Sequence, residues 1–276
     1  MMAIKWDGNR IHVEGMVEQR FTVERAGEAI PGIIWKSSQI TRPAPLVLLG
    51  HGGSGHKRNE RMVMLSQMFC EVCGWNAAAI DGPVHGDRGP VTNAADPKYA
   101  SMWQRTDPVG DMIADWKTVL DALLTLDQVD AEKIGYWGVS MGTMFGLPFV
   151  ASDPRIRVAV LGKAGMTGTS VTRSNIAQQF ERYAPQLSQP LLFTMQWDDE
   201  RFDRAGQIDL YDRLGSCDKR LHAYPGVHVD NGPGAFEFRQ LSCSAIYSEI
   251  IFYKRALHCR EIVSHARLQS SSQSSF

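Results

Sequence analysis

The stretch Lys133-Ile-Gly-Tyr-Trp-Gly138-Val-Ser140-Met-Gly142 lies at the centre of the predicted fold. Its apolar first half predicts a short buried strand, and the residues after Ser140 predict the start of a helix. Gly138 and Gly142 flank the serine in the pattern G-x-S-x-G, typical of a tight turn that strains the serine backbone. Such a turn lifts the hydroxyl to a helix N-terminus, where free N–H groups favour negative charge. The pattern is short enough to arise by chance, so its context decides its meaning.

The composition predicts an ordinary soluble globular protein, long enough for one large core. The 276 residues are 43% hydrophobic and 21% charged, and the formal net charge is −1. A net charge so close to zero gives no indication of a nucleic-acid surface or a basic membrane patch. The chain has no run of 18 apolar residues, and its first residues lack the apolar segment of a signal peptide. We therefore expect no nucleic-acid partner and no membrane partner.

The cysteines indicate a cellular compartment rather than a site. They are odd in number and scattered, at positions 70, 73, 217, 243 and 259, which favours a reducing, cytoplasmic location. Cys70 and Cys73 form a C-x-x-C pattern, but a redox site would need that pattern at a strand-to-helix turn. Here the pair closes an apolar helical stretch just before Gly74, so packing of a helix face is favoured over redox or metal chemistry.

From residue 46 onward, short apolar runs alternate with stretches of helical periodicity. Strands are predicted at 46–50, 75–80, 134–137, 158–161, 191–195 and 220–224, and helices at 58–73, 109–127, 143–151, 176–183, 206–215 and 235–262. An antiparallel pair at 20–25 and 29–35 precedes them. The alternation predicts an α/β fold with a mostly parallel, doubly wound sheet and helices on both faces. We expect a single domain over residues 1–265, with short cap insertions, and a disordered tail at 266–276.

Reactive side chains follow the predicted strands, which is where parallel sheets place their sites. A serine hydroxyl is a poor nucleophile unless a base accepts its proton and a carboxylate orients that base. Asp199 and then His228 follow Ser140 along the chain, each just past a strand. Of the eight histidines, only His228 lies where such a base must lie; the alternative is a loop histidine with surface hydrogen bonds.

Four segments carry a resemblance to a known family: His51-Gly-Gly, Asp81-Gly-Pro-Val-His-Gly, Ile134-Gly-Tyr-Trp-Gly-Val-Ser-Met-Gly and Tyr224-Pro-Gly-Val-His. Residues 20–262 resemble the α/β-hydrolase fold, and in their details the dienelactone hydrolase-like and prolyl-oligopeptidase-like serine esterases. The resemblance implies Ser140 as nucleophile, His228 as general base and Asp199 as the acid. Asp198 and Glu200 stay open as alternatives for the acid, and the family usually has Gly where Gln196 stands.

The oxyanion that forms during acyl transfer needs preorganised N–H donors. The backbone N–H of Met141, next to the serine, is one candidate, and that of Gly53, in the loop after strand 46–50, is the other. Phosphate binding is the alternative for this Gly-rich loop, but the loop lacks the Lys and Ser/Thr of that motif.

The segment 81–88 allows two interpretations. His85 and Asp87 could bind a metal together with His51 or His56, although no zinc-type spacing supports this. We favour a turn that braces the oxyanion loop.

Trp103, Met166 and Trp197 are candidates for lining the substrate pocket, although such side chains usually fill a core. Together these features predict a serine esterase that cleaves a carboxylic ester, or a lactone, of a small molecule through an acyl-enzyme, with no cofactor and no metal. Cleavage of a thioester, C–C or amide bond, and acyl transfer, would use the same residues and stay open. An inactive binding protein would lack Ser140, Asp199 or His228, and the sequence has all three. A homodimer also stays open.

Overall fold

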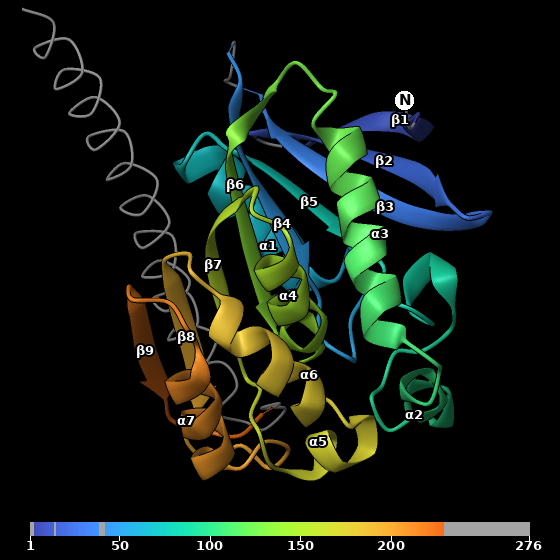
Figure 1. Ribbon diagram of the computed structural model, residues 1–276. Coiled ribbons are helices and arrows are strands. Elements are labelled where there is room, and N and C mark those ends of the chain that lie inside the picture. Colours follow the sequence, from blue (N-terminus) through green and yellow to red (C-terminus); the bar gives the residue numbers. More distant parts are fainter. Residues whose placement is uncertain (1–2, 14, 39–41, 229–276) are drawn as a thin grey trace, which may run out of the picture.

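The computed structural model describes residues 3–13, 15–38 and 42–228, and this part of the chain forms one nine-stranded sheet (Figure 1). The strand order across the sheet is β1-β2-β3-β5-β4-β6-β7-β8-β9. The strands are β1 (Lys5–Val13), β2 (Met16–Arg25), β3 (Glu28–Ser37), β4 (Ala44–Gly50), β5 (Asn76–Ile80), β6 (Val129–Val139), β7 (Ile156–Gly162), β8 (Leu191–Gln196) and β9 (Lys219–Tyr224).

The sheet is mostly parallel, as predicted. The pairs β1–β2, β2–β3 and β3–β5 are antiparallel, and every pair from β5 across to β9 is parallel. The predicted antiparallel pair corresponds to β2 and β3 and is confirmed. Strand β1 was not predicted, because most of its side chains are exposed and it shows no alternation of buried and exposed residues.

Helices fill the connections between the parallel strands. They are α1 (Glu60–Gln67), α2 (Pro97–Trp103), α3 (Pro108–Leu123), α4 (Met141–Ser152), α5 (Thr169–Ser174), α6 (Ala177–Tyr183) and α7 (Arg204–Arg213). The predicted helices are present with shifted ends, and the segment 89–108 contains the short helix α2. The helix predicted at 235–262, the domain end at 265 and the tail lie outside the described residues.

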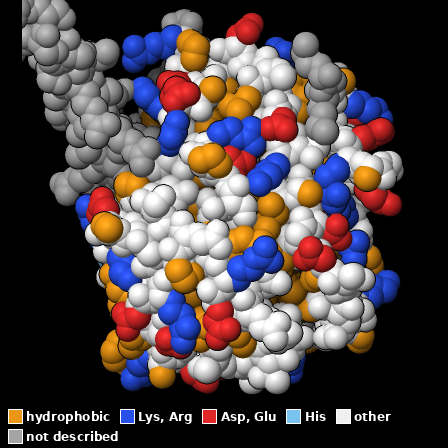
Figure 2. Space-filling view, in the orientation of Figure 1, with side chains coloured by type: hydrophobic (Ala, Val, Ile, Leu, Met, Phe, Trp, Pro, Cys, Tyr) orange, Lys and Arg blue, Asp and Glu red, His pale blue; other side chains and the backbone are white. Residues whose placement is uncertain are grey.

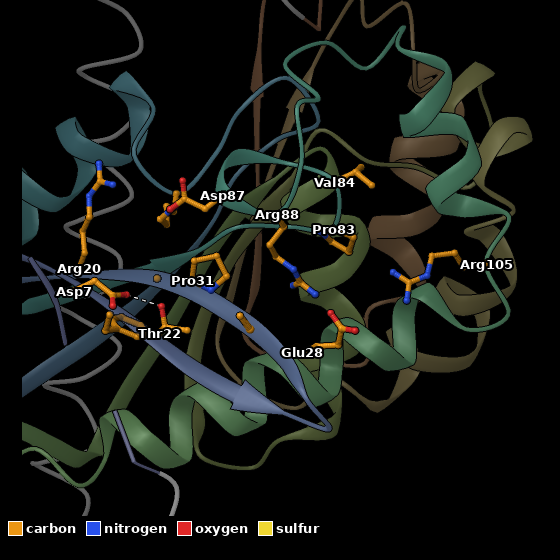
Figure 3. A pocket seen from close by; sticks show the side chains of 14 residues that line it. Asp7, Arg20, Thr22, Glu28, Pro31, Pro83, Val84, Asp87, Arg88 and Arg105 are labelled. Carbon is orange, nitrogen blue, oxygen red and sulfur yellow. Dashed lines mark hydrogen bonds and ion pairs between the residues drawn. The ribbon is translucent and has the colours of Figure 1, made fainter. Parts of the chain in front are cut away.

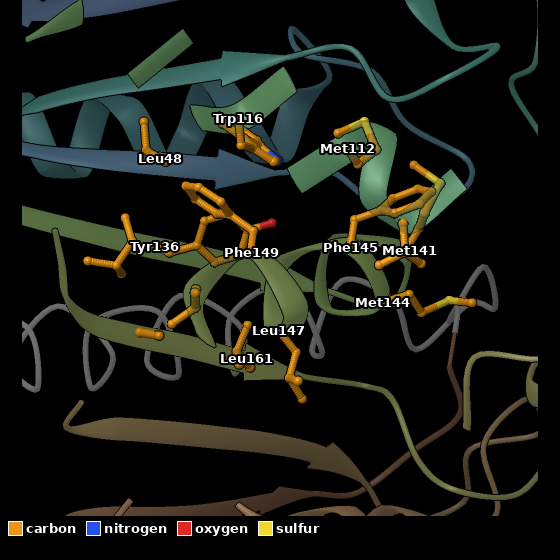
Figure 4. Close-up of a cluster of buried hydrophobic side chains, with 14 of the residues drawn as sticks. Leu48, Met112, Trp116, Tyr136, Met141, Met144, Phe145, Leu147, Phe149 and Leu161 are labelled. Carbon is orange, nitrogen blue, oxygen red and sulfur yellow. The ribbon is translucent and has the colours of Figure 1, made fainter. Parts of the chain in front are cut away.

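The larger hydrophobic core lies between the sheet and the helices α3, α4 and α6, which stand in front of the sheet in Figure 1. Trp116 of α3, Phe149 of α4 and Tyr136 of β6 pack ring against ring, with each pair of ring centroids 5.8 Å apart (Figure 4). Burial raises the pKa of the Tyr136 hydroxyl above its ordinary value. That hydroxyl donates a hydrogen bond of 2.7 Å to the Gly142 carbonyl, so the core also holds the first turn of α4 in place.

The second core covers the opposite face of the sheet, where Met62 and Leu65 of α1 belong to one buried cluster with Trp35 and Trp137. Cys70 is buried in this core and Cys73 packs against it, as the helix-face interpretation predicted. Burial raises the pKa of the Cys70 thiol to about 12, so the thiol is neutral at physiological pH. A neutral, buried thiol is a packing group rather than a redox or metal-binding group.

Candidate active site

Ser140 lies at the apex of a tight turn between β6 and α4. Its backbone has φ 57° and ψ −123°, a conformation that is uncommon for any residue with a Cβ atom. The Ser140 N–H donates to the Gly162 carbonyl of β7 at 2.9 Å, which fixes this conformation. A strained residue held by its surroundings is a frequent feature of functional sites.

The flanking glycines are required by close backbone approach. A Cβ atom on Gly138 would lie 2.6 Å from the Gly142 carbonyl oxygen, and a Cβ on Gly142 would collide with the Gly50 carbonyl oxygen. Side chains at either position would therefore push α4 away from the ends of β4 and β6. This is the steric reason for the G-x-S-x-G pattern.

Ser140, His228 and Asp199 form one continuous chain of hydrogen bonds. The Ser140 Oγ lies 2.8 Å from Nε2 of His228, and Nδ1 of His228 lies 2.7 Å from Oδ2 of Asp199. Because a carboxylate accepts only, Nδ1 carries the proton and Nε2 is free to accept from the serine hydroxyl. The His228 and Asp199 side chains are 4% and 0% exposed, so bulk water does not compete for these bonds.

The Asp199 carboxylate is held from its other side by backbone amides. Its Oδ1 accepts from the N–H groups of Arg201 at 2.8 Å and Phe202 at 3.0 Å. Burial acts to raise the pKa of Asp199, but the hydrogen bond and charge of His228 and these two amides outweigh burial, and the net pKa is lowered. The group is therefore a carboxylate at neutral pH.

The two alternative acids lie elsewhere. Asp198 is exposed and its carboxylate pairs with Arg204 at 3.1 Å. Glu200 contacts the main chain of His228 instead of its ring, accepting from the His228 N–H at 2.7 Å. Of these three adjacent carboxylates, only Asp199 touches the imidazole.

Of the two candidate oxyanion donors, Gly53 lines the same groove as Ser140, and Met141 directly follows Ser140 in the chain. A groove of about 190 Å³ is lined by Ser140, His228, Gly52 and Gly53. Met141 is the first residue of α4, so its N–H has no acceptor within the helix. Within the described ranges, neither the Met141 nor the Gly53 amide has a hydrogen-bond acceptor. Both N–H groups can therefore serve an incoming oxygen.

The segment 81–88 contacts the oxyanion loop directly. The Gly82 N–H donates to Nε2 of His51 at 2.8 Å, and Nε2 of His85 lies 3.0 Å from the Gly53 carbonyl oxygen. Asp87 pairs with Lys57 at 2.6 Å. These are the contacts of a brace, and the ring nitrogens of both histidines are engaged in hydrogen bonds. In the ranges that the structure describes, no group of three or more His, Cys, Asp or Glu side chains is arranged to hold a metal.

The protonation state of His51 makes stability depend on pH. Burial lowers the pKa of His51 from 6.5 to about 4, so the folded protein keeps the ring neutral while the unfolded chain binds a proton below pH 6.5. Because the unfolded state then holds more protons, stability is lost as the pH falls from 6.5 toward 4, by up to about 3 kcal/mol. We expect chemical denaturation between pH 4 and 7 to show this loss, with a shallower slope in His51→Gln. If stability depended equally on pH in the wild type and in His51→Gln, the neutral His51 ring would not be the cause of this loss.

A larger cavity of about 500 Å³ adjoins the Ser140 groove, and Arg201 lines both. Trp103, Tyr99 and Met144 form an apolar part of its wall. The expectations for the other two residues need correcting. Met166 is buried in the larger core, and Trp197 is 45% exposed with the Arg204 guanidinium 4.1 Å from its ring centroid. Neither lines this cavity or the groove.

Three residues near the groove were not predicted. Lys163 and Arg201 line it, and Glu200 was considered only as an acid. Lys163 directly follows Gly162, the last residue of β7, and the carboxyl end of a parallel strand is where site residues gather. That position was the available signal for Lys163.

A third cavity, of about 600 Å³, lies between the N-terminal strands and the segment 83–88 (Figure 3). Its wall carries charges of both signs, including Arg20, Glu28, Asp87 and Arg88. Neither Ser140 nor His228 lines it. The outer surface is similarly mixed, with acidic and basic side chains interspersed over the face in Figure 2. No helix within the described ranges is long and apolar enough to span a membrane.

The chain is similar to several solved esterases. No protein-family profile and no curated protein matches it. A PEG-bound cold-adapted esterase from an Arctic intertidal metagenomic library is 35% identical, with 83% of this chain and 92% of that chain covered and a TM-score of 0.72.

Two more distant structures share the fold. An acetyl xylan esterase from Paenibacillus sp. R4 is 18% identical, with 89% of each chain covered and a TM-score of 0.61. A dienelactone hydrolase-like promiscuous phosphotriesterase from metagenomic libraries is 17% identical, with 80% and 87% covered and a TM-score of 0.62. The 35% identity over nearly the full length of the Arctic esterase decides the family, and the chain belongs to the α/β-hydrolase serine esterases.

Proposed function

We propose that this protein hydrolyses carboxylic esters of small molecules, lactones included, through an acyl-enzyme intermediate on Ser140. The observation that carries the proposal is the chain of hydrogen bonds from Ser140 through His228 to Asp199, at 2.8 and 2.7 Å. This arrangement couples a nucleophile to a base and the base to a carboxylate. The relationship to a solved esterase supports the same reaction class.

In the first half of the reaction, Ser140 Oγ attacks the ester carbonyl carbon as its proton passes to Nε2 of His228. Asp199 keeps the ring oriented and stabilises the imidazolium. The carbonyl oxygen becomes an oxyanion, which accepts from the N–H groups of Gly53 and Met141; each such donor contributes on the order of 3 kcal/mol. The C–O bond to the alcohol then breaks, the alcohol leaves with the proton from Nε2, and the acyl group stays on Oγ.

In the second half, water takes the place of the alcohol. Nε2 of His228 accepts a proton from the water as the oxygen attacks the acyl carbon, and the same N–H groups hold the second oxyanion. When the bond to Oγ breaks, Ser140 recovers the proton from His228 and the carboxylic acid leaves. No group other than water is consumed.

The adjoining cavity is the proposed binding site for the larger part of the substrate. Its apolar wall, formed by Tyr99, Trp103 and Met144, suits a hydrocarbon or aromatic group. Its volume of about 500 Å³ suits a small molecule rather than a polymer segment buried as a whole.

We further propose a cytoplasmic location and a single domain. In the described part of the chain, Cys70 and Cys217 form no disulfide, which supports a reducing compartment. The nine strands of that part belong to one sheet, which supports a single domain.

A substrate panel tests the reaction class. The purified protein is expected to hydrolyse p-nitrophenyl esters with a kcat/KM well above that for matched thioester and peptide substrates. A fluorophosphonate probe, which reacts with activated serines, is expected to label Ser140, as located by peptide mass spectrometry. A protein that neither turns over any ester nor reacts with the probe would refute the proposal.

A further inference from the structure

The main chain of His228 is held on both of its polar groups by charged side chains. Its N–H donates to Oε2 of Glu200 at 2.7 Å, and its carbonyl oxygen accepts from Nζ of Lys163 at 3.1 Å. Glu200 follows β8 and Lys163 follows β7, while His228 lies in the loop after β9. Residues that follow three neighbouring strands therefore meet at the main chain of His228.

We propose that Glu200 and Lys163 are positioning residues that fix the backbone of the general base, His228. This inference rests on the proposed function, since Glu200 and Lys163 can position a general base only if His228 is that base. Glu200 and Lys163 act here through the main chain of His228, whereas Asp199 acts through its ring. The proposal therefore gives the acidic pair Asp199-Glu200 two different tasks on the same histidine.

The loop that carries His228 needs such restraint. It leaves β9 at Tyr224 and contains Gly226, whose φ of 102° is open mainly to glycine, and the exposed Val227. The backbone bonds Trp197 N–H to Tyr224 O and Asp198 N–H to Gly226 O hold its beginning, at 2.8 and 3.0 Å. Beyond Gly226, the Glu200 and Lys163 side chains continue this attachment.

Lys163 connects the base to the nucleophile. The carbonyl of Gly162, the residue before it, accepts from the Ser140 N–H at 2.9 Å, and the Lys163 N–H donates to Thr194 O of β8 at 2.9 Å. Lys163 itself has φ 48°, a left-handed conformation that non-glycine residues seldom adopt. One short segment of β7 therefore sets the backbone of Ser140 and, through the Lys163 side chain, that of His228.

The geometry separates this role from an ordinary surface ion pair. Glu200 also lies near the Arg201 guanidinium, but at 3.6 Å, whereas its contact with the His228 N–H is 2.7 Å. A carboxylate acceptor and an ammonium donor make stronger hydrogen bonds than neutral groups do. The ring of His228 must keep both its bonds at 2.8 and 2.7 Å, and a displacement of about 1 Å at such a site costs roughly 10²-fold in rate.

Glu200 is tested first. Because Glu200 lines the adjoining cavity and Lys163 lines the groove, kcat and KM are measured separately, so that an effect on substrate binding is distinguished from one on the base. We expect Glu200→Ala to lower kcat for p-nitrophenyl acetate roughly 10- to 100-fold, with KM within about twofold of wild type. Glu200→Gln keeps an oxygen that accepts from the His228 N–H, and is expected to restore kcat to within about threefold of wild type. Asp198→Ala, the exposed neighbouring carboxylate, is the matched control and is expected to keep wild-type kcat. Circular dichroism and melting temperatures would show that each variant is folded.

The outcomes separate this proposal from the proposed function. If the fluorophosphonate labels Ser140 in the wild type but Glu200→Ala keeps full kcat, the positioning role is wrong and the esterase stands. A folded Glu200→Gln that is as slow as Glu200→Ala would also overturn positioning, since charge rather than an acceptor would then matter. An increase in KM with unchanged kcat would instead make Glu200 a binding residue. Failure of the wild type to react with the probe would refute the proposed function itself.

Discussion

Replacing Ser140 with alanine is expected to lower kcat for p-nitrophenyl acetate by roughly 10⁴- to 10⁶-fold. The substitution removes the oxygen that would attack the ester, while the oxyanion donors and the binding groove remain. The fold should survive, because the Ser140 side chain does not cap α4 and its hydroxyl contacts only Nε2 of His228 among the described residues. The measurement is steady-state hydrolysis by the purified variant, with circular dichroism to check the fold.

A serine on the same helix provides the control. The Ser152 hydroxyl donates to the Pro148 carbonyl at 2.6 Å, at the end of α4 far from the turn. Ser152→Ala is expected to keep wild-type turnover and to remain labelled by a fluorophosphonate, whereas Ser140→Ala should lose both. Turnover by Ser140→Ala at the wild-type rate would exclude Ser140 as the nucleophile.

Replacing Asp199 with asparagine is the second large expected effect, a loss of kcat of roughly 10⁴-fold. Asparagine has nearly the same shape and its carbonyl oxygen can still accept from the amides of Arg201 and Phe202. Its NH₂ group would then face Nδ1 of His228 and donate to it. The proton of the imidazole would move to Nε2, which could no longer accept the proton of Ser140.

The neighbouring Asp198 gives a matched control of the same chemistry. Asp198→Asn changes an exposed carboxylate whose partner is Arg204, so kcat is expected to stay within about twofold of wild type. The same assay on both variants compares two adjacent positions under one protocol. If Asp198→Asn were the slow variant and Asp199→Asn the active one, the assignment of the acid would be reversed.

Much of the fold could be predicted because its signals are local. The strands β4, β6 and β8 each contain a continuous apolar run that ends near turn residues. Strands covered on both faces appear in a sequence as such runs rather than as an alternation of apolar and polar residues. The failures are local as well: β1 is exposed and polar, so its sequence lacks the alternation that marks a strand. The ends of α1 were misplaced because its periodicity continues through a π-helical turn at Met68–Val72.

The candidate site was predictable in its residue types and only partly in its contacts. The position of Ser140 follows from the steric demands of Gly138 and Gly142, which any sequence must meet to form this turn. Trp197 shows the limit of such reasoning: it lies two residues before Asp199 in the sequence, yet its ring is exposed and stacks against the Arg204 guanidinium. Proximity along a chain does not determine which way a loop side chain points.

The sequence by itself determined the fold class, the tight turn at Ser140 and the order of Ser140, Asp199 and His228, because periodicity and turn chemistry depend on residues close together in the chain. Only the tertiary structure decided which carboxylate meets the imidazole and which side chains hold the main chain of His228. Those contacts join residues 28 to 65 positions apart. They depend on where parallel strands end relative to one another, and that alignment is a property of the assembled sheet rather than of any segment in it.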